Sequence, residues 1–360
     1  MPKRTNQLLN SSPVGIKEIA KRANVSIATV DRVLHNRGGV AKATKIKIQE
    51  ILDEIDYHPN ILASRLKSNK KYILGILIPE VSSDTTFWEA PYNGIIQALR
   101  EIDNYGINGK PYLFNLSDKS SFVKRSQELL ADNVDAVLMA PSFVPEASRF
   151  AMELEDRQIP YLLIDSILPK REYISYIGPN LRGSGAVAAQ LTHLLLKKAK
   201  DQVLVINISS LKKPNVNLKE IEAGFHEYFE SNYPNVHVHS LSLKDGNLKT
   251  LNQKLQNYLA ENPAIRSIFV TNSRVHYVAR LLEEQGKKHL SLIGFDYLEE
   301  NLQYLKGGAI DFLICHKPEQ QGYMGIMSLH QHLVLSQEVP NVQFMPIDIV
   351  TKENCDFYPN

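Results

Sequence analysis

The chain has 360 residues, of which 43% are hydrophobic, and a formal net charge of +2 at pH 7. It is too long for one ordinary domain and has enough apolar residues for large cores. Its two cysteines, Cys315 and Cys355, give neither a disulfide framework nor the spacing of a metal site. No apolar run reaches the length of a membrane span, and the first fifteen residues lack the core of a signal peptide. We therefore expect a soluble, cytoplasmic protein of several domains.

Charge is unevenly distributed along the chain. The first 72 residues carry 14 basic and six acidic side chains, whereas the remainder carries 27 basic and 33 acidic ones. A basic head on an acidic body suits a polyanionic partner held at one end. A solvated, lysine-rich surface would give the same count, so the motifs of the head decide between these readings.

The head begins with the pattern of a helix-turn-helix. Four apolar residues share one helical face: Ile16, Ile19, Ala20 and Ala23. A turn follows, in which Ser26 is placed to cap a second helix. The inward residues of that helix are Val30, Val33 and Leu34. Such a unit places its second helix in the major groove of DNA. A third helix is predicted over about 42–55, and its basic start suits phosphate contacts.

Side chains on the second and third helices are the candidates for DNA contacts. They are Ser26, Ile27, Ala28, Thr29, Arg32, Asn36, Lys42 and Thr44. Arg32 can fork onto guanine, and Ile27 and Ala28 can pack against thymine methyl groups. A phosphate contact or a surface ion pair remains the alternative for Arg32, because phosphate contacts outnumber base contacts. Asp31 is expected to hold a neighbouring arginine or lysine in place.

A short proline-led segment follows the third helix. Pro59 ends that helix, and Asn60 can cap a new one. Isolated helices below ~12–15 residues rarely persist in water. We therefore expect residues 58–71 to be a conditional hinge helix between a DNA-binding domain, 1–57, and a ligand-binding and dimerisation domain, 72–360.

From Tyr72 onward, short apolar runs alternate with amphipathic stretches. The apolar runs predict buried parallel strands over 72–79, 110–116, 134–141, 159–165, 173–178, 201–208, 237–243, 267–272, 290–296 and 312–318. Helical patterns at 94–103, 123–132 and 148–157 predict crossover helices. The fold class is therefore a small all-α head plus an α/β body of two doubly wound parallel-sheet subdomains. Ligands bind such bodies at the carboxyl ends of the strands, in the cleft between subdomains.

Two runs of the head carry a specific resemblance. VSIATVDRVLHNRGGV and YHPNILASRLKS resemble the head of the lactose/galactose-repressor (LacI/GalR) family, and the resemblance extends from Ile16 to about Ile347. It implies that Leu66 wedges into a base step of the operator minor groove. A leucine buried in the protein is the alternative. Further hinge contacts to DNA are implied for Asn60, Ala63 and Lys67. Asp31 departs from the family, which commonly has serine there.

The resemblance also implies a body of the type I periplasmic binding protein fold. In that fold the chain crosses between lobes three times, here near Gly178, between Asp296 and His316, and after His332. The first subdomain would then comprise about 72–178 plus 310–332. The second would comprise about 179–309 plus 333–352.

Polar and aromatic side chains near strand ends are the candidates for effector binding. They are Phe87, Trp88, Asp165, Asn180, Lys219, Asn272, Asp296 and His316. Aromatic residues such as Phe87 and Trp88 stack on sugars in this fold family, although such pairs also simply pack in cores. By the resemblance, Ile221 replaces an arginine and His316 replaces a glutamine. Either Lys219, two positions earlier, substitutes for the missing arginine, or the cavity lacks that charge.

These patterns predict a homodimeric, sequence-specific transcriptional regulator, by default a repressor of a carbohydrate-utilisation operon. Its partners would be a pseudo-palindromic double-stranded operator and a sugar-like effector, with no cofactor, metal or membrane, in the cytoplasm at the nucleoid. The C-terminal segment has no leucine repeat, which favours a dimer over a tetramer. A transport-type solute-binding protein is the alternative, against which the basic head argues. An enzyme is disfavoured because no dinucleotide, phosphate-loop or nucleophile motif is present.

Overall fold

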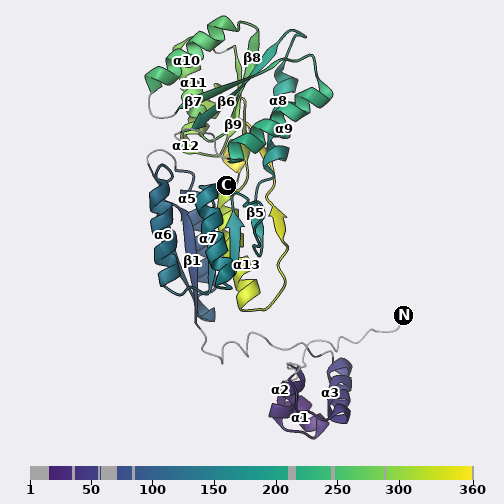
Figure 1. Cartoon of the computed structure of the whole chain (residues 1–360). Helices are drawn as coiled ribbons and strands as arrows, with labels where there is room; N and C mark the ends of the chain where they lie inside the picture. The colour runs from purple at the N-terminus through teal and green to yellow at the C-terminus, as the bar shows by residue number, and fades with distance from the viewer. Residues whose placement is uncertain are drawn as a thin grey trace, which may run out of the picture. The chain divides into compact units, whose positions relative to one another are not determined.

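The computed structural model of the chain describes residues 16–34, 37–55, 57, 71–82, 86–209, 216–244, 248–287 and 289–358. Two compact units divide the chain, Met1–Lys67 and Ser68–Asn360, coloured purple and blue to yellow in Figure 1. None of the helices in these ranges combines the length and apolar composition that a bilayer crossing requires.

The described part of the first unit contains three helices, which follow the predicted order. They are α1 (Ile16–Ala23), α2 (Ile27–Leu34) and α3 (Lys42–Glu54). Each contributes fully or nearly buried side chains to one small core: Ile19, Ala20, Ala23, Val30, Val33, Ile48 and Leu52. The helical spacing of these residues therefore gives the helix-turn-helix its core, as the sequence predicts.

The turn between α1 and α2 is fixed by backbone hydrogen bonds and one cap. Asn24 is left-handed, with φ +57°, and its N–H donates to the Lys21 carbonyl at 3.2 Å. The next N–H, of Val25, donates to the Ala20 carbonyl at 3.0 Å, which completes a Schellman ending of α1. Ser26 Oγ then accepts from the Thr29 N–H at 3.1 Å. The predicted cap is confirmed, and it sets where α2 begins.

The first lobe of the second unit is built on a six-stranded parallel sheet with the order β11-β5-β4-β3-β1-β2. Its strands are β1 (Tyr72–Pro79), β2 (Ile107–Phe114), β3 (Ala136–Met139), β4 (Tyr161–Ile164), β5 (Tyr176–Gly178) and β11 (Val342–Phe344). Two helices pack together on one face, α5 (Glu89–Glu101) and α13 (Pro318–Leu333). The other face carries α6 (Lys119–Ala131) and α7 (Val144–Asp156). A short 3-10 turn, η1 (Asp103–Tyr105), follows α5.

The second lobe repeats this plan with the strand order β12-β10-β9-β8-β6-β7. Its strands are β6 (Gln202–Ser209), β7 (Val238–Lys244), β8 (Ile265–Val270), β9 (Ser291–Phe295), β10 (Phe312–Cys315) and β12 (Asp348–Val350). Only β12 is antiparallel among the pairings of this sheet that the described residues make. Its helices are α8 (Leu181–Leu195), α9 (Val216–Asn232), α10 (Leu248–Glu261), α11 (Val275–Glu284) and α12 (Glu299–Lys306), with a final 3-10 turn, η2 (Cys355–Phe357).

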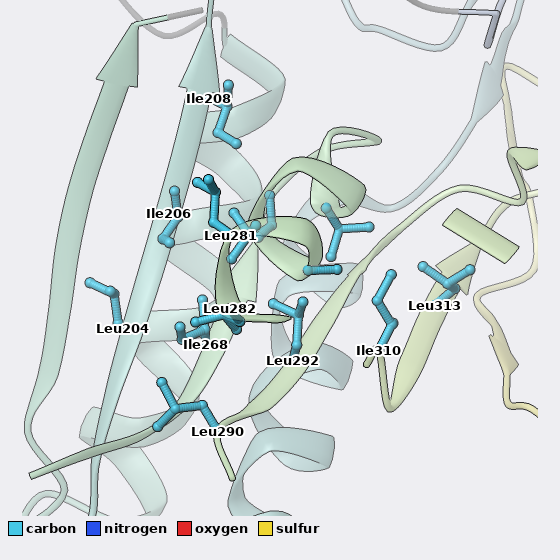
Figure 2. Close-up of a cluster of buried hydrophobic side chains, with 14 of the residues drawn as sticks. Leu204, Ile206, Ile208, Ile268, Leu281, Leu282, Leu290, Leu292, Ile310 and Leu313 are labelled. Atoms are coloured by element: carbon cyan, nitrogen blue, oxygen red, sulfur yellow. The ribbon is translucent and has the colours of Figure 1, made fainter. Parts of the chain in front are cut away.

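Both faces of the second sheet are covered by apolar side chains. Figure 2 shows Leu204, Ile206 and Ile208 of β6 on the same side as Leu281 and Leu282 of α11. The opposite face packs α8 and α9 against β6, β8 and β9. Burying such an aliphatic side chain contributes roughly 1.5–3 kcal/mol. Two-sided burial explains why these strands read as continuous apolar runs in the sequence.

Two expected boundaries between the lobes are wrong. The sequence predicts residues 310–332 in the first lobe; α13 does pack there, but β10 pairs with β9 and β12 in the second sheet. The sequence predicts residues 333–352 in the second lobe; β12 does pair there, but β11 pairs with β5 in the first sheet. The chain therefore changes lobe between Gly178 and Leu181, between Cys315 and Pro318, and between Phe344 and Asp348. The apolarity of a short segment does not show which of the two sheets it joins, because either sheet can pair with a short strand.

Candidate functional site

Among the described residues, most of those predicted to contact DNA lie on α2 or at its N-cap. Ser26, Ile27, Ala28 and Arg32 are exposed, and Thr29 is half-buried. Ile27 is 49% exposed although it is a large aliphatic residue. An isoleucine left open in the first turn of this helix is available for an apolar contact such as a thymine methyl group.

Arg32 and Asp31 are both tied to the loop that follows α2. Arg32 Nη1 donates to the Gly38 carbonyl at 3.1 Å, and Arg37 Nη1 lies 3.4 Å from Asp31 Oδ2. The prediction that Asp31 holds a neighbouring arginine is confirmed. Asn36 lies outside the described residues, so its DNA contact stays a prediction.

The start of α3 offers groups that suit a phosphate. Lys42 is exposed and Thr44 is half-buried. Ala41, at the N-cap, contributes no side-chain hydrogen bond to the described helix, so the first-turn N–H groups point outward beside Lys42. Four predicted hinge contacts lie outside the described residues and remain predictions: Asn60, Ala63, Leu66 and Lys67.

In the second unit, a cavity lies between the two lobes at the carboxyl ends of their strands. It measures about 170 Å³, which is smaller than the range of about 300–1,000 Å³ for drug-sized ligands and suits a small ligand. Six of the eight predicted effector residues line it together: Phe87, Trp88, Asp165, Asn272, Asp296 and His316. The rule that polar residues at strand ends converge is therefore a good guide to this cavity.

Asp165 and Asp296 occupy equivalent positions in the two lobes. Asp165 follows β4 and Asp296 follows β9, and these strands hold the same place in their sheets. Both residues are left-handed, with φ +67° and +72°. Their N–H groups donate to carbonyls of the adjacent strands, at 3.3 Å to Ile177 and 3.0 Å to Ile314. A left-handed non-glycine residue is strained, and such strain concentrates at binding sites.

The two carboxyl groups influence each other's protonation. Burial raises the pKa of Asp165, while hydrogen bonds from Ser166 and Asn217 oppose the rise. Burial and the negative charge of Asp165 raise the pKa of Asp296 to about 8. Near neutral pH Asp296 is therefore largely protonated, and its carboxyl group can donate as well as accept a hydrogen bond.

The aromatic pair belongs to the core of the first lobe and also borders the cavity. Trp88 is 4% exposed and belongs to the core of the first lobe, yet it also borders the cavity. Phe87 meets it edge-to-face, with ring centroids 5.4 Å apart, and is half-buried. Phe87 is therefore the more exposed of the two rings, and Trp88 packs against it.

His316 and Asn272 hold the walls of the cavity in place. His316 Nε2 lies 2.8 Å from Ser184 Oγ, and its ring stacks on Phe295 with centroids 5.6 Å apart. Burial lowers the pKa of His316 to about 4, so the imidazole is neutral at physiological pH. Asn272 Nδ2 donates to the Ile208 carbonyl at 2.6 Å, which ties the loop after β8 to β6.

Two predicted effector residues do not line the cavity. Asn180 is exposed, and its Oδ1 accepts from the Gly183 N–H at 2.9 Å, so it caps α8. Lys219 is exposed on α9, because the phase of that helix turns Leu218 and Ile221 inward instead. Lys219 therefore does not replace the missing arginine.

The sequence reading missed several residues that line the cavity. Asn217 lies in the first turn of α9, Arg274 directly precedes α11, and Gln321 lies near the start of α13. None of them follows a strand directly, which is the signal the prediction used. In the described ranges, no group of three or more histidine, cysteine, aspartate or glutamate side chains is arranged to hold a metal ion.

Comparisons with known proteins agree with both units. Residues 15–60 match the family of bacterial regulatory proteins of the lacI type, and residues 75–337 match the periplasmic binding protein domain. The crystal structure described as a LacI transcriptional regulator from Bacteroides fragilis has 30% sequence identity and a TM-score of 0.74, and the match covers 81% of this chain and 100% of that chain.

Two further relatives match different portions. The HTH-type transcriptional regulator RegA of Clostridium acetobutylicum is 34% identical over 151 residues, or 42% of this chain and 43% of RegA, so the matched part is under half of that relative. A solute binding protein from Burkholderia graminis, solved with D-arabinose, shares the fold at 24% identity and a TM-score of 0.71, over 81% of this chain and 99% of that one. The chain belongs to the lacI family of bacterial transcriptional regulators, a non-enzymatic family, and carries a periplasmic-binding-protein-like effector domain.

Proposed function

We propose that the chain is a homodimeric regulator that binds a pseudo-palindromic operator and represses genes for carbohydrate use. A sugar-like effector would bind in the cavity between the lobes and alter operator affinity. The observation that carries the proposal is the coexistence, in one chain, of an open α2 face and a cavity lined by side chains of both lobes. Such a protein would act at the nucleoid in the cytoplasm.

The lining of the cavity favours a polyhydroxylated ligand. Asp165 and Asp296 offer paired oxygens to vicinal hydroxyl groups, and Phe87 offers a ring on which a sugar face can stack. The solute binding protein from Burkholderia graminis holds D-arabinose in the same fold, but the proposal for this chain rests on its own side chains.

The charge of the lining favours uncharged and amino sugars over sugar acids and sugar phosphates. The described lining of the cavity has two carboxyl groups and one cation, Arg274, but Asp296 is largely protonated near neutral pH, so the negative excess lies mainly in the neighbouring groove. That groove shares Phe87 and Asp296 with the cavity and adds four glutamates: Glu89, Glu299, Glu300 and Glu319. A cleft lined mainly by one sign of charge repels ligands of that sign.

The effector can switch DNA binding only through different affinities for two states of the protein. A ligand that contacts Asp165 and Asp296 bridges the lobes and therefore favours one lobe angle. That angle would set the spacing of the two hinge segments in the dimer. The paired hinges would then form or melt, and with them the wedge proposed for Leu66.

Operator selection with the full chain tests the proposal. Rounds of selection from randomised duplexes at fixed salt are expected to enrich a pseudo-palindrome, and Leu66→Ala is expected to weaken its binding without changing effector affinity. The proposed recognition of a pseudo-palindromic operator is wrong if no sequence is enriched, and the body would then be left with solute binding as its proposed role. Solute binding is favoured by the fold that the body shares with the solute binding protein from Burkholderia graminis.

Thermal shift of the full chain against matched sugars tests the effector class. Glucose, glucosamine, glucuronate and glucose 6-phosphate present one ring with different charges, and the same set can be made for galactose and arabinose. A neutral or amino member is expected to raise Tm by mass action. A hit confined to the acids or phosphates would contradict the charge argument.

A further inference from the structure

Asn217 joins the two lobes through its side chain. It lies in the first turn of α9, in the second lobe, and lines the cavity. Its Nδ2 donates to Ser166 Oγ at 2.7 Å and to Asp165 Oδ2 at 3.2 Å. Both acceptors follow β4 in the first lobe. One amide group therefore bridges the cleft at the carboxylate that is expected to hold the effector.

This bridge is separate from the covalent connections between the lobes. The chain crosses near Pro179, His316 and Ile347, whereas Asn217 is 51 and 52 positions from its acceptors. A hydrogen bond across the cleft exists only while the lobes stay close. Asn217, Ser166 and Asp165 are each hydrogen-bonded to the other two, since Ser166 Oγ also donates to Asp165 Oδ2 at 2.9 Å.

The bridge leaves part of Asp165 for a ligand. The hydrogen bonds from Ser166 Oγ and from Asn217 Nδ2 both end on Oδ2 of Asp165. No described residue donates a side-chain hydrogen bond to Oδ1 of Asp165. A carboxylate offers about four lone-pair sites. The bridge and an effector can therefore occupy the same carboxylate together.

We propose that Asn217 is an interlobe latch: it holds the cleft closed before the effector arrives and orients the Asp165 carboxylate so that Oδ1 faces the ligand. Asn217 is a positioning residue in this scheme. The role of the latch in effector binding rests on the proposed function, but the latch itself is a property of the ligand-free protein. A cleft that is already closed spares the effector the free energy of closing it.

The latch can be removed without damage to the fold. Asn217 is half-buried in the first turn of a helix, where alanine is well tolerated. Asn217→Ala removes both hydrogen bonds, and Ser166→Ala removes one acceptor. Asn232→Ala is a matched control at the other end of α9, because the Asn232 side chain donates only to the Tyr228 carbonyl of its own helix among the described contacts.

Interlobe distances in the ligand-free full chain test the latch. Met152→Cys on α7 and Leu194→Cys on α8 provide spin-label sites, since these side chains are 49% and 71% exposed. Both native cysteines are buried, and a labelling blank without the new sites measures any reaction at them. Pulsed electron paramagnetic resonance then measures the distance between the two labels, one in each lobe, and so reports the populations of closed and open protein.

Asn217→Ala is expected to shift the ratio of open to closed protein by on the order of tenfold, which is the effect of losing one to two hydrogen bonds. Ser166→Ala is expected to give a smaller shift, and Asn232→Ala none. For a sugar found by thermal shift, Kd is expected to rise in Asn217→Ala if the native cleft is mostly closed.

Two results would overturn the latch: an unchanged distance distribution in Asn217→Ala, or an equal change in Asn232→Ala. Circular dichroism and Tm identify a variant that fails to fold, and Ser166→Ala then provides the decisive comparison. A confirmed latch in a protein that binds no sugar would refute the proposed effector instead. The latch and the proposed effector can therefore be refuted independently of each other.

Discussion

Because the pKa of Asp296 is raised in the folded protein, we expect the protein to lose stability as the pH rises. The carboxyl group of Asp296 is buried near Asp165, which raises its pKa to about 8 from 3.8. The folded protein therefore favours the protonated form more than the unfolded chain does. The stability from this proton is fully present below about pH 4 and is lost as the pH rises toward 8.

The magnitude follows from linkage. Between pH 5 and pH 8 each pH unit costs at most about 1.4 kcal/mol, which sets a ceiling of about 4 kcal/mol over the window. Asp296 also borders a cavity that is open to solvent, and solvent screening reduces the effect. We therefore expect the ionisation of Asp296 to cost about 1–2 kcal/mol of unfolding free energy.

Asp296→Asn removes the charge and keeps the shape, and asparagine also tolerates the left-handed backbone at this position. The Tm of the variant minus that of the native chain should grow from pH 5 to pH 8. The expected gain is about 2–4 °C for each kcal/mol. Scanning calorimetry of the second unit's transition in the full chain, without sugars, measures this difference.

A comparison with Asp165→Asn tests the cause. This substitution removes the neighbouring charge that helps to raise the pKa of Asp296, so the pKa of Asp296 should fall and the pH dependence should weaken. A Tm difference between Asp296→Asn and the native chain that stays the same at pH 5 and pH 8 would refute the reasoning.

Three further predictions concern other parts of the molecule. Arg32→Gln should weaken binding of a selected operator roughly tenfold to a hundredfold by fluorescence anisotropy, and Arg22→Gln on α1 much less, because a base contact is worth about 1–3 kcal/mol. Gly224→Ala should destabilise the protein by about 2–3 kcal/mol in denaturant titrations, since a new Cβ would meet the Arg182 carbonyl of α8. Gly307→Ala should cost much less, because there the nearest atom, the Gln303 carbonyl oxygen, would lie 3.2 Å from the new Cβ. Binding of a sugar should shift the emission of Trp88, the single tryptophan, because it borders the cavity; an unchanged spectrum would contradict its placement.

Long buried strands were predictable, and short edge strands were not. Runs such as residues 72–79 and 201–208 are buried on both faces, so their apolarity alone identifies β1 and β6. In contrast, β11 has three residues, of which Val342 and Phe344 are 43% and 57% exposed. Only its pairing with β5 defines it as a strand, and pairing is not written in local sequence.

The same limit applies to the residues of the site: those that follow a buried strand were predictable, and those placed by tertiary packing were not. Asp165 and Asp296 were found because each directly follows a buried strand. Asn217 was missed because its role depends on a partner about fifty residues away in the other lobe. Lys219 was misplaced because the inward face of α9 is set by packing, which turns Ile221 inward and leaves the lysine outside.

The most direct test of the proposed switch is operator affinity with and without the sugar that raises Tm. Fluorescence anisotropy on the selected operator, at one fixed salt concentration, compares the two states of the same preparation. A change of about 5- to 150-fold in Kd is predicted, as expected for a coupling of about 1–3 kcal/mol. An identical Kd in saturating sugar would contradict the link between the cleft and DNA.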